Sequence, residues 1–191
     1  MRKVFPLIVF MMLMMPITAV HGQTPPHLID CHVHNNGDPV FIEKLVAKLN
    51  EVDGMAFLLT KPADLASAEA AIKKYPNRLI GFGDISPDDP RALEILDSIH
   101  AAGFRGVGEI TSTLKNYDDR SYWPFYARAE KYGMIMLFHT GIVNRTEPWV
   151  PSDISVDRLR PTLLDGIARR FPKLTIIGAH LGNPEIGRAH V

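Results

Sequence analysis

Residues 134–141 read Met-Ile-Met-Leu-Phe-His-Thr-Gly, in which the apolar run 134–138 is followed directly by His139. The run follows an amphipathic stretch at residues 122–132, and Gly133 separates the two. A short run of this composition is typical of a strand buried on both faces, and glycine is a common helix stop. The stretch therefore predicts a helix followed by a buried strand with a polar group at its carboxyl end.

The same alternation runs through the rest of the chain. Apolar runs predict strands over residues 27–34, 53–60, 78–85, 104–110, 134–140 and 174–180. Amphipathic stretches between them predict helices over residues 40–52, 63–75, 90–102, 122–132 and 157–171. Strict alternation predicts an α/β protein with parallel strands and right-handed crossovers. Six strands fit either a doubly wound sheet or part of an eight-stranded βα barrel, and the spacing alone leaves both open.

Composition narrows the class of protein. The 191 residues suffice for one domain, and 46% hydrophobic with 22% charged residues is ordinary for a packed globular chain. Lys and Arg number 21, as do Asp and Glu, so no basic excess points to nucleic acid or an anionic membrane surface. The single cysteine, Cys31, excludes an intrachain disulfide.

The first 22 residues are typical of an export signal. A positive start precedes an apolar stretch at residues 4–20, and Gly22 follows at a plausible cleavage position. We expect a signal peptide at residues 1–22, a mature domain at 23–185, and a periplasmic or secreted location with no membrane contact after cleavage. The alternative, an uncleaved anchor, has a span shorter than the ~20 apolar residues that a membrane helix needs.

The last six residues, 186–191, read Ile-Gly-Arg-Ala-His-Val. One encoding, ATCGGAAGAGCACACGTC followed by the stop TGA, matches the start of a common sequencing-library adapter. We therefore expect a non-native tail at 186–191 and a natural reading frame that continues after Glu185. The alternative is a native short protein whose tail matches by chance.

Side chains of the metal-ligand type end four of the six predicted strands. They are His32 and His34 on the first strand, Glu109 on the fourth, His139 on the fifth and His180 on the sixth. The carboxyl ends of parallel strands form the edge at which such folds carry their active sites. Imidazole and carboxylate ligands suit Zn²⁺, with Mn²⁺ or Fe²⁺ as alternatives, so the pattern predicts a site for one or two divalent ions.

The first strand allows a finer expectation. Residues i and i+2 of a strand share a face, so His32 and His34 should point together while Cys31 and Val33 face the helices. Asp30 would lie one layer deeper on the histidine face and could orient a ligand ring.

These motifs give the chain a specific resemblance. Asp30–His34, Glu109, Phe138–Gly141 and Gly178–Gly182 resemble the amidohydrolase superfamily of metal-dependent (βα)₈ barrels. The likeness is greatest to the amidohydrolase-related family, which also includes decarboxylases and hydratases. The resemblance implies an incomplete (βα)₈ TIM barrel with about six βα units.

The resemblance also implies roles. His32, His34 and His139 would bind metal, Glu109 would be a ligand or a bridge between two ions, and His180 would bind a second ion or act as the acid/base. The implied reaction is hydrolysis, in which metal-activated water attacks an amide, ester or lactone carbonyl. A decarboxylase of the same family and an inactive fragment are the alternatives. The aspartate that ends the superfamily's eighth strand has no counterpart in this sequence.

Four further residues are candidates for binding a small-molecule substrate. Lys61 and Asp84 follow the second and third predicted strands, and Arg145 and Trp149 lie in the long segment after the fifth. Loops at this end of a parallel sheet commonly carry binding residues. The sequence does not specify the substrate. It is compatible with either a monomer or a homo-oligomer.

Overall fold

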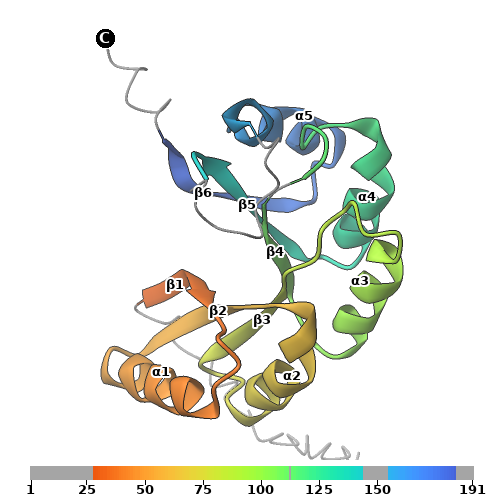
Figure 1. Ribbon diagram of the computed structural model, residues 1–191. Coiled ribbons are helices and arrows are strands. Elements are labelled where there is room, and N and C mark those ends of the chain that lie inside the picture. The colour runs from red at the N-terminus through yellow and green to blue at the C-terminus, as the bar shows by residue number, and fades with distance from the viewer. Residues whose placement is uncertain (1–27, 112, 144–154, 184–191) are drawn as a thin grey trace, which may run out of the picture.

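The structure, a computed structural model, describes residues 28–111, 113–143 and 155–183 (Figure 1). Within them six strands form one sheet: β1 (Leu28–His34), β2 (Gly54–Thr60), β3 (Leu79–Gly83), β4 (Gly106–Ile110), β5 (Ile135–Gly141) and β6 (Thr175–Asn183). The expected signal peptide and the expected tail lie outside the described residues.

Helices connect successive strands. They are α1 (Pro39–Glu51), α2 (Leu65–Lys74), α3 (Ala92–Ala101), α4 (Trp123–Lys131) and α5 (Leu163–Arg170), with the short 3₁₀ helices η1 (Pro62–Asp64), η2 (Arg120–Tyr122) and η3 (Val156–Leu159). The single helix expected over 157–171 was wrong: it is divided into η3 and α5 around Pro161, whose ring cannot continue a helix. No helix of the described part has the length and hydropathy to cross a bilayer.

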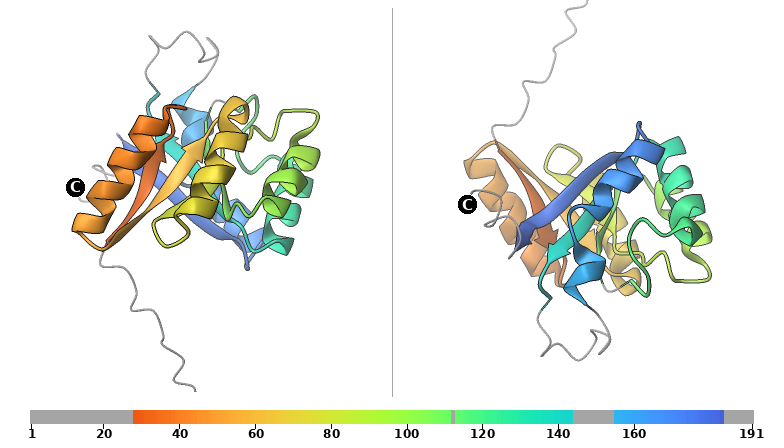
Figure 2. Two further views of the ribbon diagram at one scale, coloured as in Figure 1. Left: turned by 90° about the horizontal axis from the view of Figure 1, so that it is seen from below. Right: turned by 90° about the horizontal axis from the view of Figure 1, so that it is seen from above.

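The order of the strands decides the architecture. The sheet runs β1-β2-β3-β4-β5-β6, and every neighbouring pair is parallel. A doubly wound sheet would reverse its strand order at a switch point, whereas a βα barrel keeps chain order. The helices lie around the outside of the curved sheet (Figures 1 and 2). The fold is therefore an incomplete TIM barrel, as predicted, with six strands and five connecting α-helices in the described residues and with β1 and β6 at its edges.

Two apolar cores follow from the alternation of side chains along each strand. In β2, Ala56 and Leu58 pack outward into the core between sheet and helices. Phe57 and Leu59 point the other way, into an inner cluster built from strand residues alone. Fully burying one such side chain stabilises a fold by about 1.5–3 kcal/mol, so both cores anchor the strands whose ends carry the site.

Candidate metal centre

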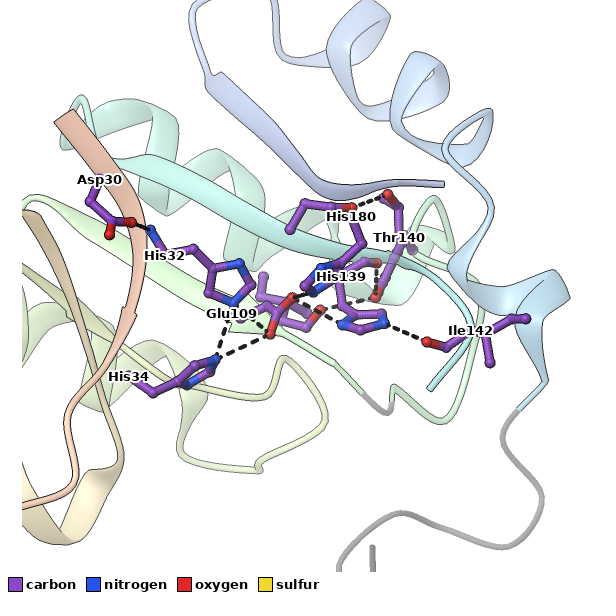
Figure 3. A network of polar contacts seen from close by, with 11 residues as sticks. Asp30, His32, His34, Glu109, His139, Thr140, Ile142 and His180 are labelled. Atoms are coloured by element: carbon purple, nitrogen blue, oxygen red, sulfur yellow. Dashed lines mark hydrogen bonds and ion pairs between the residues drawn. The ribbon is translucent and has the colours of Figure 1, made fainter. Parts of the chain in front are cut away.

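The five side chains predicted as metal ligands lie together at the carboxyl ends of the strands (Figure 3). Oε2 of Glu109 is 3.2 Å from Nε2 of His32 and 3.7 Å from Nε2 of His34. Oε1 of the same carboxylate is 2.9 Å from Nδ1 of His139 and 2.9 Å from Nε2 of His180. Glu109 is thus shared by two groups of three ligands, one with the histidines of β1 and one with those of β5 and β6.

Three of the five ligands sit where the sheet register shifts. In β1, Cys31 and His32 together face the single residue Phe57 of β2. In β4, Gly108 and Glu109 together face Leu137 of β5. Such bulges re-aim a side chain and are frequent beside active sites.

The bulge in β1 corrects one expectation from the sequence. Cys31 was expected to face the helices with Val33, but it packs against the inner cluster, whereas Val33 packs against the outer core. The extra residue in β1 breaks the period of two between these positions. Burial and the charge of Asp30 raise the pKa of the Cys31 thiol, which keeps it protonated. Asp30 accepts a hydrogen bond from the backbone N–H of His32 (3.0 Å) and does not bond its ring.

The third register shift places His180. Thr140 alone, in β5, faces residues 180–182 of β6, because His139 pairs with Ala179 and Gly141 with Asn183. His180 and Leu181 have φ of +63° and +53°, a left-handed conformation that costs a non-glycine residue on the order of 1–3 kcal/mol.

Glycines permit the close backbone approach at two of these shifts. A Cβ on Gly108 would overlap the carbonyl of Leu137, and one on Gly141 would overlap the backbone of Asn183. Both glycines also have positive φ, +134° and +105°, which side chains disfavour. These two positions therefore require glycine for the site to form.

A buried tyrosine ties β4 to β5 beneath the site. The hydroxyl of Tyr117 lies 2.9 Å from the carbonyl oxygen of Ile110 and 2.8 Å from that of His139. The ring is fully buried, and burial together with the charge of Glu109 raises the pKa of the hydroxyl. Tyr117 thus remains a neutral donor next to two ligand-bearing positions, a role that nothing in the sequence pattern signals.

The electrostatics keep Glu109 ionised. Burial of the carboxyl, which is 8% exposed, would raise its pKa. The hydrogen bond and charge of His139, with the charges of His32 and His180, outweigh burial and lower the pKa to about 2. The carboxylate is therefore negative throughout the neutral range.

Both ring nitrogens of His139 face hydrogen-bond acceptors. Its Nε2 lies 3.3 Å from the carbonyl oxygen of Ile142, which can only accept a hydrogen bond. Nδ1 faces Oε1 of Glu109 at 2.9 Å. A neutral ring carries one proton, so it can donate to only one of these two acceptors. A second proton on the ring, or a metal ion between Nδ1 and Oε1, would satisfy both contacts.

The spacing of the first group fits a small divalent ion. Its three ligand atoms, from His32, His34 and Glu109, are 3.1, 3.2 and 3.7 Å apart. In a tetrahedral zinc site with metal–ligand bonds of about 2.0–2.1 Å, ligand atoms are about 3.3–3.4 Å apart. In the second group, the ligand atoms of Glu109, His139 and His180 all lie within 4.8 Å of one another. The donor set and spacing suit a metal ion.

Two of the predicted substrate residues lie near this cluster. The partly buried Asp84 follows β3, and burial together with the charge of Glu109 raises its pKa to about 6, against the opposing charge of Lys61. Lys61 follows β2, is exposed, and also acts electrostatically on His34. The structure therefore puts a cation and a carboxyl that titrates near pH 6 beside the histidine cluster. Arg145 and Trp149 lie outside the described residues.

Comparison with known proteins gives a family match over most of the chain. A family model described as amidohydrolase matches residues 29–191. No match was found among curated proteins.

Solved structures with the same fold are distant in sequence. A candidate amidohydrolase from Staphylococcus aureus shares 18% identity at a TM-score of 0.57, over 81% of this chain and 67% of that one. A 5-carboxyvanillate decarboxylase from Sphingomonas paucimobilis shares 15% at 0.55, over 81% and 68%. A 2,6-dihydroxybenzoate decarboxylase from Rhizobium shares 15% at 0.55, over 82% and 67%. At these identities the likeness establishes a common fold.

Proposed function

We propose that this chain, which belongs to the amidohydrolase family, is a metal-dependent hydrolase of small molecules that carry an amide, ester or lactone carbonyl. The observation that carries the proposal is the carboxylate of Glu109 shared by two groups of histidines. A ligand that serves both groups suits a centre for one or two ions, and such centres are common in enzymes that hydrolyse carbonyl compounds.

Four residues of the cluster are the proposed ligands of the first ion. His32, His34, Glu109 and His139 would hold the ion, with Zn²⁺ preferred and Mn²⁺ or Fe²⁺ as alternatives. A bound divalent ion would lower the pKa of a water molecule and polarise the substrate carbonyl. Glu109, ionised down to a pH of about 2, keeps its negative charge over the whole working range.

His180 is the proposed acid/base. Its side chain is 42% exposed, against 13% for His139, so a substrate can reach it while Nε2 stays 2.9 Å from Glu109. A general acid or base must lie within hydrogen-bond reach of the proton that it moves, and an imidazole can accept and return a proton near neutral pH. If a second ion binds, His180 would be its ligand and a different group would move the proton.

Lys61 and Asp84 are the proposed substrate contacts. The ammonium group would attract an anionic substrate. Asp84, with a pKa of about 6, would donate a hydrogen bond below that pH and accept one above it. Arg145 and Trp149 remain predicted contacts from the sequence.

A decarboxylase is the second candidate. Two of the structures with this fold are decarboxylases of aromatic carboxylic acids. Lys61 beside the histidine cluster would suit the carboxylate of such a substrate. His180 would then protonate carbon instead of a leaving group.

One set of assays tests these alternatives. Metal-stripped protein is reloaded with Zn²⁺, Mn²⁺ or Fe²⁺, its metal content is measured, and it is offered lactones, esters and amides in one panel and carboxylated hydroxyaromatic acids in another. We expect the wild-type protein to turn over substrates of the first panel. His180→Gln should lose this activity, and His100→Gln on α3 should keep it. Release of CO₂ from the second panel would favour the decarboxylase. Metal binding without either turnover would favour an inactive chain.

A further inference from the structure

Next to the site, β6 bulges away from β5 at residues 180–182, and we call this bulge the loop-out. Three consecutive residues of β6, His180, Leu181 and Gly182, have left-handed φ of +63°, +53° and +65°. Only one residue of β5, Thr140, lies opposite them. Single left-handed residues are common in loops, but a run that includes two side chains persists only where its surroundings hold it.

The hydroxyl of Thr140 bridges the base of this loop-out (Figure 3). It donates a hydrogen bond to the carbonyl oxygen of Ala179 and accepts one from the backbone N–H of Gly182 at 3.0 Å. The two bonds use the hydroxyl's single proton and one of its lone pairs. They span the residue before His180 and the second residue after it, so they set the width of the loop-out.

Burial makes the bridge a strong constraint. Thr140 is 1% exposed, so water cannot replace its hydroxyl when the hydroxyl is lost. Beyond the loop-out, the backbone N–H of Ile142 donates a hydrogen bond to the carbonyl oxygen of Asn183 at 3.0 Å, so the two strands pair again there. The backbone bond between Ile142 and Asn183 closes the far side of the loop-out, and the hydroxyl of Thr140 closes its base.

We propose that Thr140 is a positioning residue that holds His180 at 2.9 Å from Glu109. The inference rests on the proposed function, because it concerns a side chain of the same metal centre. Thr140 touches neither metal nor substrate in this role. It acts through the backbone of β6, and its hydroxyl is the group that matters.

The chain offers a matched control. Thr60 is also a fully buried threonine at the carboxyl end of a strand, but its hydroxyl donates to Leu58 of its own strand at 3.1 Å. Thr60→Val removes the same chemical group from a similar environment without opening a connection between strands. Thr140→Val is the test variant, Thr140→Ser restores the hydroxyl, and Thr140→Ala serves if the valine variant does not fold.

Two measurements on the metal-free protein report on the position directly. We expect amide hydrogen exchange at Gly182 to be at least about 10-fold faster in Thr140→Val, because the amide loses its acceptor. We also expect the ring proton resonances of His180 to shift in Thr140→Val and to stay in place in Thr140→Ser and Thr60→Val. Unchanged exchange and unchanged resonances in Thr140→Val would overturn the inference, whether or not the protein binds metal.

Turnover and metal affinity then link the position to function. Loss of a group that orients a residue of a metal site typically lowers metal affinity or activity by about 10- to 100-fold. In Thr140→Val we expect this loss in turnover where His180 is the acid/base, and in Zn²⁺ affinity where His180 binds a second ion. Thr140→Ser and Thr60→Val should lose less than about threefold in either measurement. In a His180→Ala background, Thr140→Val should add nothing, because the side chain that it positions is gone.

The outcomes separate the two proposals. Wild-type protein that binds no divalent metal would refute the proposed function, while the exchange and resonance data would still decide the role of Thr140. Wild-type protein that binds metal, with equal losses in Thr140→Val and Thr60→Val, would refute the role of Thr140 and leave the proposed function intact.

Discussion

Replacement of Glu109 by glutamine should remove most of the metal affinity. The carboxylate supplies Oε2 to the group with His32 and His34, and Oε1 to the group with His139 and His180. Glutamine keeps the shape of the side chain but carries no charge and turns an N–H₂ group toward one of the two groups. Both groups are therefore damaged by one substitution.

The size of the effect follows from the distances. The oxygens of Glu109 lie about 3 Å from the neighbouring ligand atoms, and a bound cation would be no farther away. A carboxylate and a divalent cation about 3 Å apart interact by about 11 kcal/mol at an effective dielectric constant of about 20. Even a quarter of that, about 2.8 kcal/mol, corresponds to an affinity loss of about 100-fold.

The assay is a competition titration of metal-stripped protein against a chromogenic chelator, with the bound metal counted after gel filtration. Glu51→Gln is the control, because Glu51 lies exposed on α1 and pairs only with Lys48 among the described residues. If Glu109→Gln binds Zn²⁺ within about threefold of the control variant, the shared carboxylate does not hold the metal and the reasoning fails.

Three further changes test other parts of the structure. Tyr117→Phe removes the hydroxyl between the carbonyls of Ile110 and His139, so Zn²⁺ affinity should fall by about 10-fold in the same titration; unchanged affinity would show that the tyrosine only packs. Asp84→Asn should stabilise the metal-free protein by about 1–3 kcal/mol at pH 7 and little at pH 4 in urea unfolding, because the raised pKa of about 6 makes ionisation costly as the pH rises from 3.8; equal effects at both pH values would contradict this. The ionised Glu109 should stabilise the metal-free fold above pH 4.5, a contribution lost as the pH falls toward 2, so the melting temperatures of wild-type protein and Glu109→Gln should converge over that range.

The pattern of helices and strands could be predicted because it depends on local composition. Buried strands of a barrel need continuous apolar runs, and the helices that cover them need one apolar face. Each element can therefore be predicted from about ten consecutive residues. The helix expected over 157–171 fails at Pro161, where a single ring overrides an otherwise helical pattern.

The candidate ligands could also be predicted, because parallel strands bring their carboxyl ends to one edge whatever their exact register. The direction in which these side chains point could not be predicted. His32, Glu109 and His180 all lie where one strand holds more residues than its neighbour. Register belongs to a pair of strands, so no single run of sequence reveals it.

The sequence by itself determined that strands and helices alternate and that histidines and a glutamate end four strands, since these depend on short stretches of chain. Only the tertiary structure decided which atoms of those side chains meet, which way Cys31 points, and that Thr140 and Tyr117 support the site. The physical reason is that bulges and buried hydroxyl bridges form between residues that are neighbours in space, across strands that the sequence keeps far apart.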